Sequence, residues 1–235
     1  MSATPACALR LRDLSFAWPG AEPLIRIGQF ELRSGERVFL AGPSGSGKST
    51  LLGLLAGTLT PQRGEVHVAD LCVSGLSARA RDRARADHIG VIFQQFNLLP
   101  FLSVLDNVTL ACRFSKRRSE RAVARDGDVE SSARRLLAEL GLPEASWARP
   151  ASSLSVGQQQ RVAAARALIG APELILADEP TSALDADARG DFLRLLLEEC
   201  AAAQTALLFV SHDRSLMDRF DRAVDLRDLQ VGSVA

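Results

Sequence analysis

Apolar and polar residues alternate along the first third of the chain. The segment Leu9–Phe16 reads Leu-Arg-Leu-Arg-Asp-Leu-Ser-Phe, and Ile25–Leu32 continues in the same way. A period of two is typical of a strand that buries one of its faces. The apolar run Arg37–Ala41 predicts a buried strand, and further strands are expected at Glu65–Val68 and Ile89–Phe93. We therefore expect a twisted, partly antiparallel sheet in this part of the chain.

The pattern changes after residue 93. Between Gln94 and about Ser153 the spacing predicts helices joined by loops, including a helix over Val129–Leu140 that stops at Gly141. An alternation of helices and strands then resumes, which is typical of an α/β fold. Its expected members are a helix over Gly157–Ile169, a strand over Leu174–Asp178, a helix over Asp187–Ala202, a strand over Thr205–Val210 and a helix over Ser215–Phe220.

A glycine-rich loop joins the strand Arg37–Ala41 to an apolar helix. It consists of Gly42, Pro43, Ser44, Gly45, Ser46, Gly47, Lys48, Ser49 and Thr50. Glycines let the backbone wrap closely enough for its N–H groups to hold phosphates, and the start of the helix adds further donors. In such a P-loop, Lys48 reaches the β- and γ-phosphates and the Ser49 hydroxyl binds Mg²⁺. A turn that binds nothing is the alternative, but strand, loop and helix together favour an ATP site.

A pair of acidic residues ends the apolar strand Leu174–Asp178. In a P-loop protein an aspartate at this point lies beside Mg²⁺, so Asp178 is the candidate metal residue. Glu179 follows it and is the candidate general base toward the attacking water. Two acids that merely cap the next helix are the alternative interpretation, which the upstream P-loop disfavours.

The segment Leu154–Val162 reads Leu-Ser-Val-Gly-Gln-Gln-Gln-Arg-Val and resembles the signature motif of the ATP-binding cassette (ABC) family. Gln94, the segment Ser182–Asp185 and His212 complete the motif set of that family, in its order. The resemblance covers essentially the whole chain. It implies an α/β fold: a P-loop NTPase (RecA-like) core with an antiparallel β subdomain and an inserted α-helical subdomain.

The resemblance also implies one nucleotide-binding domain over residues 1–235. Residues 1–93 and 154–235 would form the β subdomain and the RecA-like core, and residues 94–153 the helical subdomain. Ser155, the Gly157 N–H and Gln158 stand at a helix start and form a second anion site. As in the family, two chains would pair head to tail around two ATP molecules, with Ser155 of one facing Lys48 of the other.

Position 156 departs from the family, which usually has glycine there. A β-branched residue such as Val156 does not readily adopt a positive φ. We therefore expect either an extended backbone or a strained loop at this position, with the contacts of Ser155 and Gly157 retained.

The remaining site residues are assigned by the resemblance. Gln94 would bind Mg²⁺ and link the nucleotide to the helical subdomain, with Gln95 as the alternative register. His212 would bond the γ-phosphate and complete a catalytic set with Lys48 and Glu179. His67 and His88 stand in no such motif and are interpreted as structural or surface residues.

Two further assignments have open alternatives. Asp185 would contact the opposite protomer, or cap the helix that begins near Asp187. Trp18 would stack on adenine, with Phe16 as a second candidate; packing in the core is the alternative role of the tryptophan.

The sequence from Phe93 to Val108 resembles the same segment in the branch of lipoprotein-release (LolD-like), macrolide-efflux (MacB-like) and cell-division (FtsE-like) ATPases. ATPases of polar amino-acid importers are an alternative, as are soluble ABC ATPases. A P-loop kinase would not need the Leu154–Gln158 signature. The branch implies a separate integral-membrane permease as partner, and an apolar cluster between Phe96 and Leu102 is the candidate docking surface or, alternatively, part of the core.

Composition narrows the partners and the location. Basic and acidic residues balance at 28 each, so no general attraction to nucleic acid is expected. The arginine-rich runs 79–85 and 113–125 contain interleaved acids and are interpreted as solvated surface. No run is long enough to span a membrane, no secretory signal is recognisable, and the four cysteines lack metal-ligand spacing. With a permease, this predicts a peripheral protein on the cytoplasmic face of the inner membrane.

Overall fold

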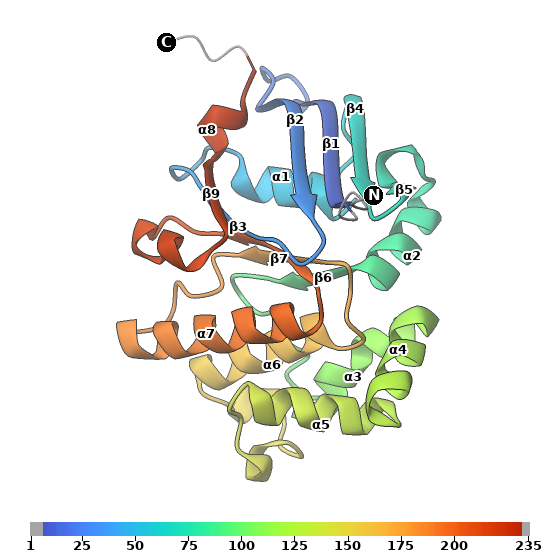
Figure 1. The fold of residues 1–235 in the computed structure, drawn as a ribbon, viewed down its shortest axis with the longest axis vertical. Helices are drawn as coiled ribbons and strands as arrows, with labels where there is room; N and C mark the ends of the chain where they lie inside the picture. The colour runs from blue at the N-terminus through green and yellow to red at the C-terminus, as the bar shows by residue number, and fades with distance from the viewer. Residues whose placement is uncertain (1–6, 232–235) are drawn as a thin grey trace, which may run out of the picture.

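The computed structural model describes residues 7–231, which form two β-sheets with helices between and below them (Figure 1). The antiparallel sheet has the order β2-β1-β4-β5 and the parallel sheet the order β6-β7-β8-β3-β9. The strands are β1 Cys7–Phe16, β2 Ile25–Arg33, β3 Arg37–Ala41, β4 Arg63–Val68, β5 Leu71–Cys72, β6 Ile89–Ile92, β7 Leu174–Asp178, β8 Ala206–Val210 and β9 Arg222–Asp225.

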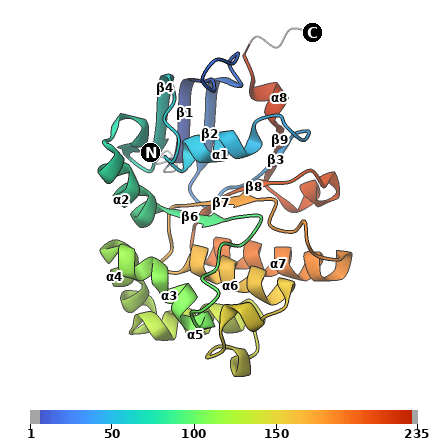
Figure 2. The same cartoon turned by 180° about the vertical axis from the view of Figure 1, so that it is seen from behind.

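Helices lie on both sides of the parallel sheet. The α-helices are α1 Lys48–Leu55, α2 Ala78–His88, α3 Val104–Phe114, α4 Lys116–Asp126, α5 Val129–Glu139, α6 Val156–Leu168, α7 Ala186–Ala202 and α8 Leu226–Leu229. Helix α1 lies between the two sheets, whereas α6 and α7 cover the opposite face of the parallel sheet (Figures 1 and 2). Helices α3 and α4 lie beside α6, and α5 lies farther from the sheet. Short 3₁₀ turns lie at Val73–Gly75, Glu144–Ser146, Ala151–Ser153 and Arg214–Arg219.

Each parallel strand divides its side chains between two hydrophobic cores. In β3, Val38 and Leu40 point to the core shared with α1 and the antiparallel sheet, while Phe39 points to the core shared with α6 and α7. Strands β7 and β8 divide in the same way. Because successive side chains alternate across a strand, a sheet covered on both faces needs continuous apolar strands. This explains why these strands read as unbroken apolar runs.

The expected strands and long helices are confirmed, with small differences at their ends. The last predicted helix, Ser215–Phe220, is instead a 3₁₀ turn over Arg214–Arg219. Asp213 caps this turn by accepting hydrogen bonds from the Ser215 N–H at 3.1 Å and the Ser215 hydroxyl at 2.6 Å. Within residues 7–231, none of the helices has the length and apolar character that crossing a bilayer requires.

One side chain of the arginine-rich run 113–125 is wrongly interpreted as surface. Arg118 on α4 is only 4% exposed. Its guanidinium donates to the carbonyl oxygens of Ile169 at 2.7 Å and of Ala167 at 2.6 Å. Free carbonyls at the end of α6 therefore account for its burial, since buried polar groups need hydrogen-bond partners.

Strand β6 passes very close to the end of α6. A Cβ added to Gly90 would collide with the carbonyl oxygen of Ala167. We expect Gly90→Ala to lower the free energy of unfolding by about 2 kcal/mol or more, because backbone has to move to make room. Chemical denaturation of both proteins measures this difference. Gly75→Ala is the control, since its Cβ would meet only the Cys72 sulfur at 3.7 Å, and an equal loss in both variants would contradict the steric explanation.

Candidate nucleotide site

The glycine-rich loop connects β3 to α1 at the carboxyl end of the parallel sheet. Gly47 caps α1 with a φ of 98°, a conformation that favours glycine. A Cβ on Gly42 would lie 2.8 Å from the Ser46 hydroxyl oxygen, so a side chain at this position would displace that hydroxyl. The loop thus folds back tightly over the first turn of α1, with backbone N–H groups and the positive end of the helix together.

Lys48 lies inside this loop. Its ammonium Nζ donates to the carbonyl oxygens of Gly42 at 2.8 Å and Pro43 at 2.9 Å. The Ser46 hydroxyl is buried and has no hydrogen-bond partner among the described residues. An ammonium and an unsatisfied hydroxyl beside a helix start form a donor set that fits a phosphate group.

A pocket of about 390 Å³ opens in front of the loop. It brings together segments that lie far apart in the sequence. Its lining residues are Leu24, Ser44, Gly45, Gly47, Lys48, Ser49, Thr50, Gln94, Asp178, Glu179 and His212. The P-loop, the two acids, the glutamine and the histidine singled out in the sequence therefore share one cavity.

Asp178 ends β7 and faces α1 across the pocket. The Ser49 hydroxyl donates to its Oδ2 at 3.0 Å. Burial raises the pKa of Asp178, and the Ser49 bond and the Lys48 charge offset only part of this effect. A hydroxyl and a desolvated carboxylate are oxygen ligands of the kind that Mg²⁺ prefers.

Glu179 follows with a strained backbone. Its φ is 46°, which non-glycine residues rarely adopt. The carboxylate Oε2 lies 2.9 Å from Nδ1 of His212 and accepts from the Ser211 hydroxyl at 3.3 Å. The Glu179 side chain is 13% exposed, whereas that of His212 is 69% exposed. The histidine can therefore reach a molecule in the pocket while one ring nitrogen remains on the acid.

Gln94 and Trp18 differ in their relation to the pocket. Gln94 lines it, whereas Gln95 is not among the described lining residues. Trp18 is 47% exposed and packs edge to face on Phe16, with 5.2 Å between the ring centroids. It also lies outside the described lining. Leu24 does line the pocket, and no motif in the sequence singles it out.

The signature residues lie at the start of α6. The Ser155 hydroxyl accepts from the Gln158 N–H at 3.3 Å, and the Gln158 side chain accepts from the Ser155 N–H at 3.1 Å. This reciprocal capping box fixes the first turn, which includes Gly157. In the described chain, none of these three residues belongs to the pocket lining. They form a second group of helix-start donors, separate from Lys48.

The expectation for Val156 is wrong. It is the first residue of α6, so its backbone is helical, neither extended nor a strained loop. The Ser155 cap places the helix start one residue earlier than predicted, and the Val156 side chain is 48% exposed. A β-branched residue is tolerated at an exposed first helical position because it meets no preceding turn.

Asp185 caps α7, and its Oδ1 accepts from the Ala188 N–H at 2.9 Å. The capping alternative is therefore observed. Both histidines without a motif contact carboxylates at hydrogen-bond distance: His67 Nε2 lies 2.8 Å from Glu65, and His88 Nδ1 lies 3.0 Å from Glu173. The four cysteines are free thiols.

Comparison with known proteins decides the family. The family described as "ABC transporter" matches residues 26–182. The chain belongs to this family. It is an ATPase and the ATP-binding subunit of an ABC transporter.

Curated relatives of this ABC protein share most of its length. It is 42% identical over 206 residues to the lipoprotein-releasing system ATP-binding protein LolD of Hydrogenovibrio crunogenus, with 88% of this chain and 86% of that protein covered. It is also 39% identical over 223 residues to the macrolide export ATP-binding/permease protein MacB of Rhodopseudomonas palustris, covering 94% of this chain but 33% of that protein.

Solved structures give the same fold. The ATP-binding cassette MJ0796, described as a dimer in a post-hydrolysis state bound to ADP and Pi, superposes with a TM-score of 0.81 at 32% identity. The match covers 95% of this chain and 96% of that chain. The α/β fold is therefore that of ABC ATPase cassettes.

Burial of the Asp178 carboxylate should lower the free energy of unfolding of the nucleotide-free protein. Its folded-state pKa lies above the usual value, so stability falls as the pH rises through that pKa and the full cost applies at pH 7. We expect Asp178→Asn to raise the Tm of the nucleotide-free protein at pH 7 by roughly 1–4 °C.

Melting curves at several pH values measure the sign of the change in Tm that Asp178→Asn causes. The advantage of Asp178→Asn should shrink as the pH falls through the raised pKa of Asp178, and it should vanish below about pH 4, where the wild-type carboxyl is protonated in both states. Asp225→Asn is a control of opposite sign, because a hydrogen bond from Arg227 lowers the pKa of Asp225 to about 2. That variant should lower the Tm at pH 7; a loss of Tm in both variants would show that Asp178 is not destabilising.

Proposed function

We propose that this protein hydrolyses Mg²⁺-ATP in a head-to-tail homodimer and drives a separate membrane permease of the lipoprotein-release or efflux type. The observation that carries the proposal is the single pocket that unites Lys48, Ser49, Asp178 and Glu179. Similarity to LolD and MacB proteins supports the transport class. A polar amino-acid importer and a soluble ABC ATPase are the alternatives.

The donor set of the pocket fits ATP with Mg²⁺. Lys48, the unsatisfied Ser46 hydroxyl and the loop backbone would hold the phosphates, and Trp18 would lie on the adenine side. Ser49, Asp178 and Gln94 would bind Mg²⁺ or its water, and the metal supplies charge neutralisation at the phosphates. The aspartate is the main negative charge for the cation, because the other two ligands are neutral.

Glu179 is the proposed general base. Its carboxylate accepts the proton of the attacking water, and His212 beside Oε2 orients the acid and contacts the γ-phosphate with its exposed ring. Lys48 carries the charge that binds the phosphates. Lysine and glutamate therefore support different steps, binding and proton transfer.

This division of roles can be tested with two variants. Lys48→Ala should weaken ATP affinity about 10- to 100-fold, because a charge-assisted contact is lost. Glu179→Gln should keep ATP affinity within about threefold and lower turnover about 10²- to 10⁴-fold, because only proton transfer is lost. Fluorescent-nucleotide titration and phosphate-release assays measure the two quantities.

Glu65→Gln is the matched control, since this exposed carboxylate lies on β4 outside the pocket lining. Glu65→Gln should retain the ATP affinity and the turnover rate of the wild type. Turnover of Glu179→Gln at the wild-type rate would contradict the assignment of Glu179 as the base. The phosphate-binding role of Lys48 is tested separately, by the ATP affinity of Lys48→Ala.

The dimer follows from the separation of two donor groups. Ser155, Gly157 and Gln158 lie outside the nucleotide pocket of their own chain, although they form a helix start suited to an anion. A second copy would bring them to the γ-phosphate held by Lys48, with Asp185 near the same interface. Solved structures of the similar cassette MJ0796 are described as dimeric, which supports this arrangement.

We propose residues 94–153 as a helical subdomain that receives the permease, with residues 1–93 and 154–235 as the rest of one nucleotide-binding domain. A groove of about 550 Å³ lies where α3, α4 and α6 face α2 and β6. Its apolar lining includes Ile89, Val91, Phe93, Leu110 and Phe114, and Phe114 is 73% exposed. This groove replaces the segment Phe96–Leu102 as the proposed docking surface.

The segment Phe96–Leu102 is a poorer candidate for docking. Phe96 is buried in the core, and Asn107 holds the loop by bonding both the N–H and the carbonyl oxygen of Leu99. Only Phe101, 75% exposed, stands free among its apolar residues, and none of the segment's described residues lines the groove.

Two arginines of the groove wall have no acidic partner in the described chain, whereas Arg85 pairs with Asp82, which also lines the groove. Arg118 and Arg166 donate to backbone carbonyl oxygens, and neither forms an ion pair within residues 7–231. Burial lowers the pKa of both, to about 10 for Arg118, which leaves them charged at neutral pH. The proposed occupant is therefore a permease segment with an apolar face and a carboxylate. Zero net charge gives no comparable support for nucleic acid.

Photocrosslinking in cells tests whether this surface meets an integral-membrane partner, as expected for a protein on the cytoplasmic face of the membrane. A benzophenone amino acid in place of Phe114 should crosslink one integral-membrane protein in intact cells. Val123 is the matched control position, because it is apolar and 44% exposed on α4 but not a groove residue. Equal crosslinking from both positions, or crosslinking from residue 114 only to soluble proteins or nucleic acid, would contradict the permease site.

A further inference from the structure

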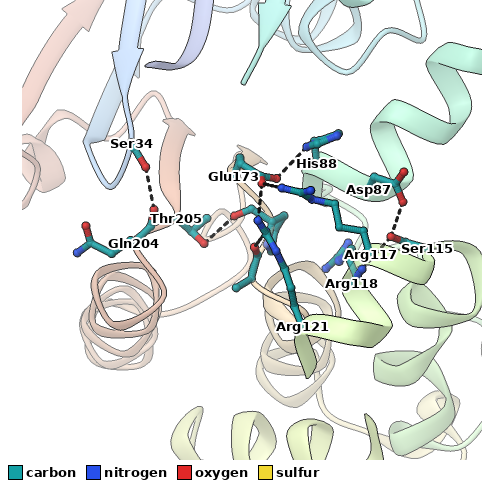
Figure 3. A network of polar contacts seen from close by, with 12 residues as sticks. Ser34, Asp87, His88, Ser115, Arg117, Arg118, Arg121, Glu173, Gln204 and Thr205 are labelled. Atoms are coloured by element: carbon teal, nitrogen blue, oxygen red, sulfur yellow. Dashed lines mark hydrogen bonds and ion pairs between the residues drawn. The ribbon is translucent and has the colours of Figure 1, made fainter. Parts of the chain in front are cut away.

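A cluster of charged residues connects α4 to the rest of the protein (Figure 3). It lies at the carboxyl end of α6, whose other end begins after Ser155. Arg117 and Arg121 lie one turn apart on α4, and both donate to Oε1 of Glu173, at 2.5 and 2.7 Å. The other carboxylate oxygen of Glu173 lies 3.0 Å from Nδ1 of His88, at the end of α2. Glu173 thus joins α4 and α2 to the loop that precedes β7.

Glu173 remains charged in this position. Burial alone raises its pKa, but the bonds from His88 and Arg117 and the charge of Arg121 outweigh this and lower the pKa of Glu173 to about 2. Its side chain is 19% exposed, so solvent screens these contacts less than those of surface pairs. The groups that face Glu173 are therefore all cationic or able to become so.

A second contact fixes α4 to the last turn of α6. The buried guanidinium of Arg118 donates to the carbonyl oxygens of Arg166, Ala167 and Ile169, at 3.1, 2.6 and 2.7 Å. Backbones are also close, since a Cβ on Gly170 would lie 2.5 Å from the Arg118 carbonyl oxygen. Arg118 supplies partners for helix-end carbonyls that would otherwise be unsatisfied. We call Arg117, Arg118, Arg121 and Glu173 the α4 clamp.

A further hydrogen bond joins α4 to α2 beside the clamp. The Ser115 hydroxyl, which caps α4, donates to Oδ1 of Asp87 on α2 at 2.5 Å. Arg118 belongs both to the clamp and to the groove lining. Figure 2 places α2 directly above α4 on the same side of the molecule. The two walls of the groove are therefore joined at the clamp.

We propose that Glu173 is a positioning residue for the reaction: the α4 clamp sets the orientation of the helices between residues 94 and 153, and through α6 the place of Ser155. Helix α6 has 13 residues and is about 20 Å long. A small rotation at its clamped end therefore becomes a larger displacement of Ser155 at the other end. This inference rests on the proposed function, in which Ser155 completes the nucleotide site of a second copy.

The first experiment measures orientation in the monomer. Spin labels at Thr60 and Ala145, both exposed, report the distance between the sheets and the helices by pulsed electron resonance, with Cys7 and Cys72 replaced by serine. Glu173→Gln should broaden or shift the distance distribution. Asp126→Asn is the matched control, because Asp126 pairs with Arg135 between α4 and α5 and does not touch the sheet side. Its distribution should equal that of the wild type.

The second experiment measures the consequence for Ser155. In a Glu179→Gln background, Glu173→Gln should weaken ATP-dependent dimerisation about 5- to 10-fold, by about 1 kcal/mol, while ATP affinity of the monomer changes less than twofold. A purely structural role would lower the Tm and leave dimer affinity unchanged. Asp126→Asn again serves as the control for lost stability.

The outcomes separate the two proposals. An unchanged distance distribution in Glu173→Gln overturns the clamp, whatever the dimer does. A changed distance distribution without loss of dimer affinity overturns the role of Glu173 in positioning Ser155. If the Glu179→Gln protein stays monomeric at saturating ATP, the proposed dimer is wrong, and so is the proposed positioning of Ser155 for a second copy. The distance measurement still decides whether Glu173 sets the orientation of the helices between residues 94 and 153.

Discussion

The side-by-side pairing of β7, β8 and β3 is the constraint on which the proposed nucleotide site depends. Asp178 on β7 and Leu40 on β3 both pair with Val210 on β8, so the three strands end at one level. The glycine-rich loop, the two acids and the Ser211–His212 pair follow directly from these ends. Because parallel strands share one carboxyl edge, groups from three distant segments meet there without any long loop having to carry them.

That arrangement concentrates local instability where the chemistry takes place. Glu179 keeps a positive φ, Asp178 is a desolvated carboxylate, and the Ser46 hydroxyl has no partner in the described chain. Each feature costs free energy in the nucleotide-free state, and the two apolar cores on either side of the sheet offset the cost. A bound phosphate and cation would satisfy the same groups, which ties nucleotide binding to the stability of the pocket.

Contiguous features were predictable from the sequence and contacts between distant segments were not. The P-loop, Asp178–Glu179 and the Ser155 cap are each encoded within a few residues, so fold, family and most pocket residues could be expected. Arg118 could not, because its run has the composition of a solvated helix and its carbonyl partner Ile169 lies 51 residues away. The groove was also missed, since its walls come from α2, β6, α3, α4 and α6, and exposure of Phe114 depends on how these elements pack.

Helix α6 links the proposed sites mechanically. Its first residues form the donor group around Ser155, its middle packs in the core with α7 and β7, and its last turn is held by Arg118 and by the close approach of Gly90. A well-packed helix moves as a rigid rod, so a change in the groove near Arg118 and Arg166 cannot be absorbed within it. The signal from a partner in the groove would therefore have to reach the far end as a displacement of Ser155, and the interface of a second copy is where that displacement would matter.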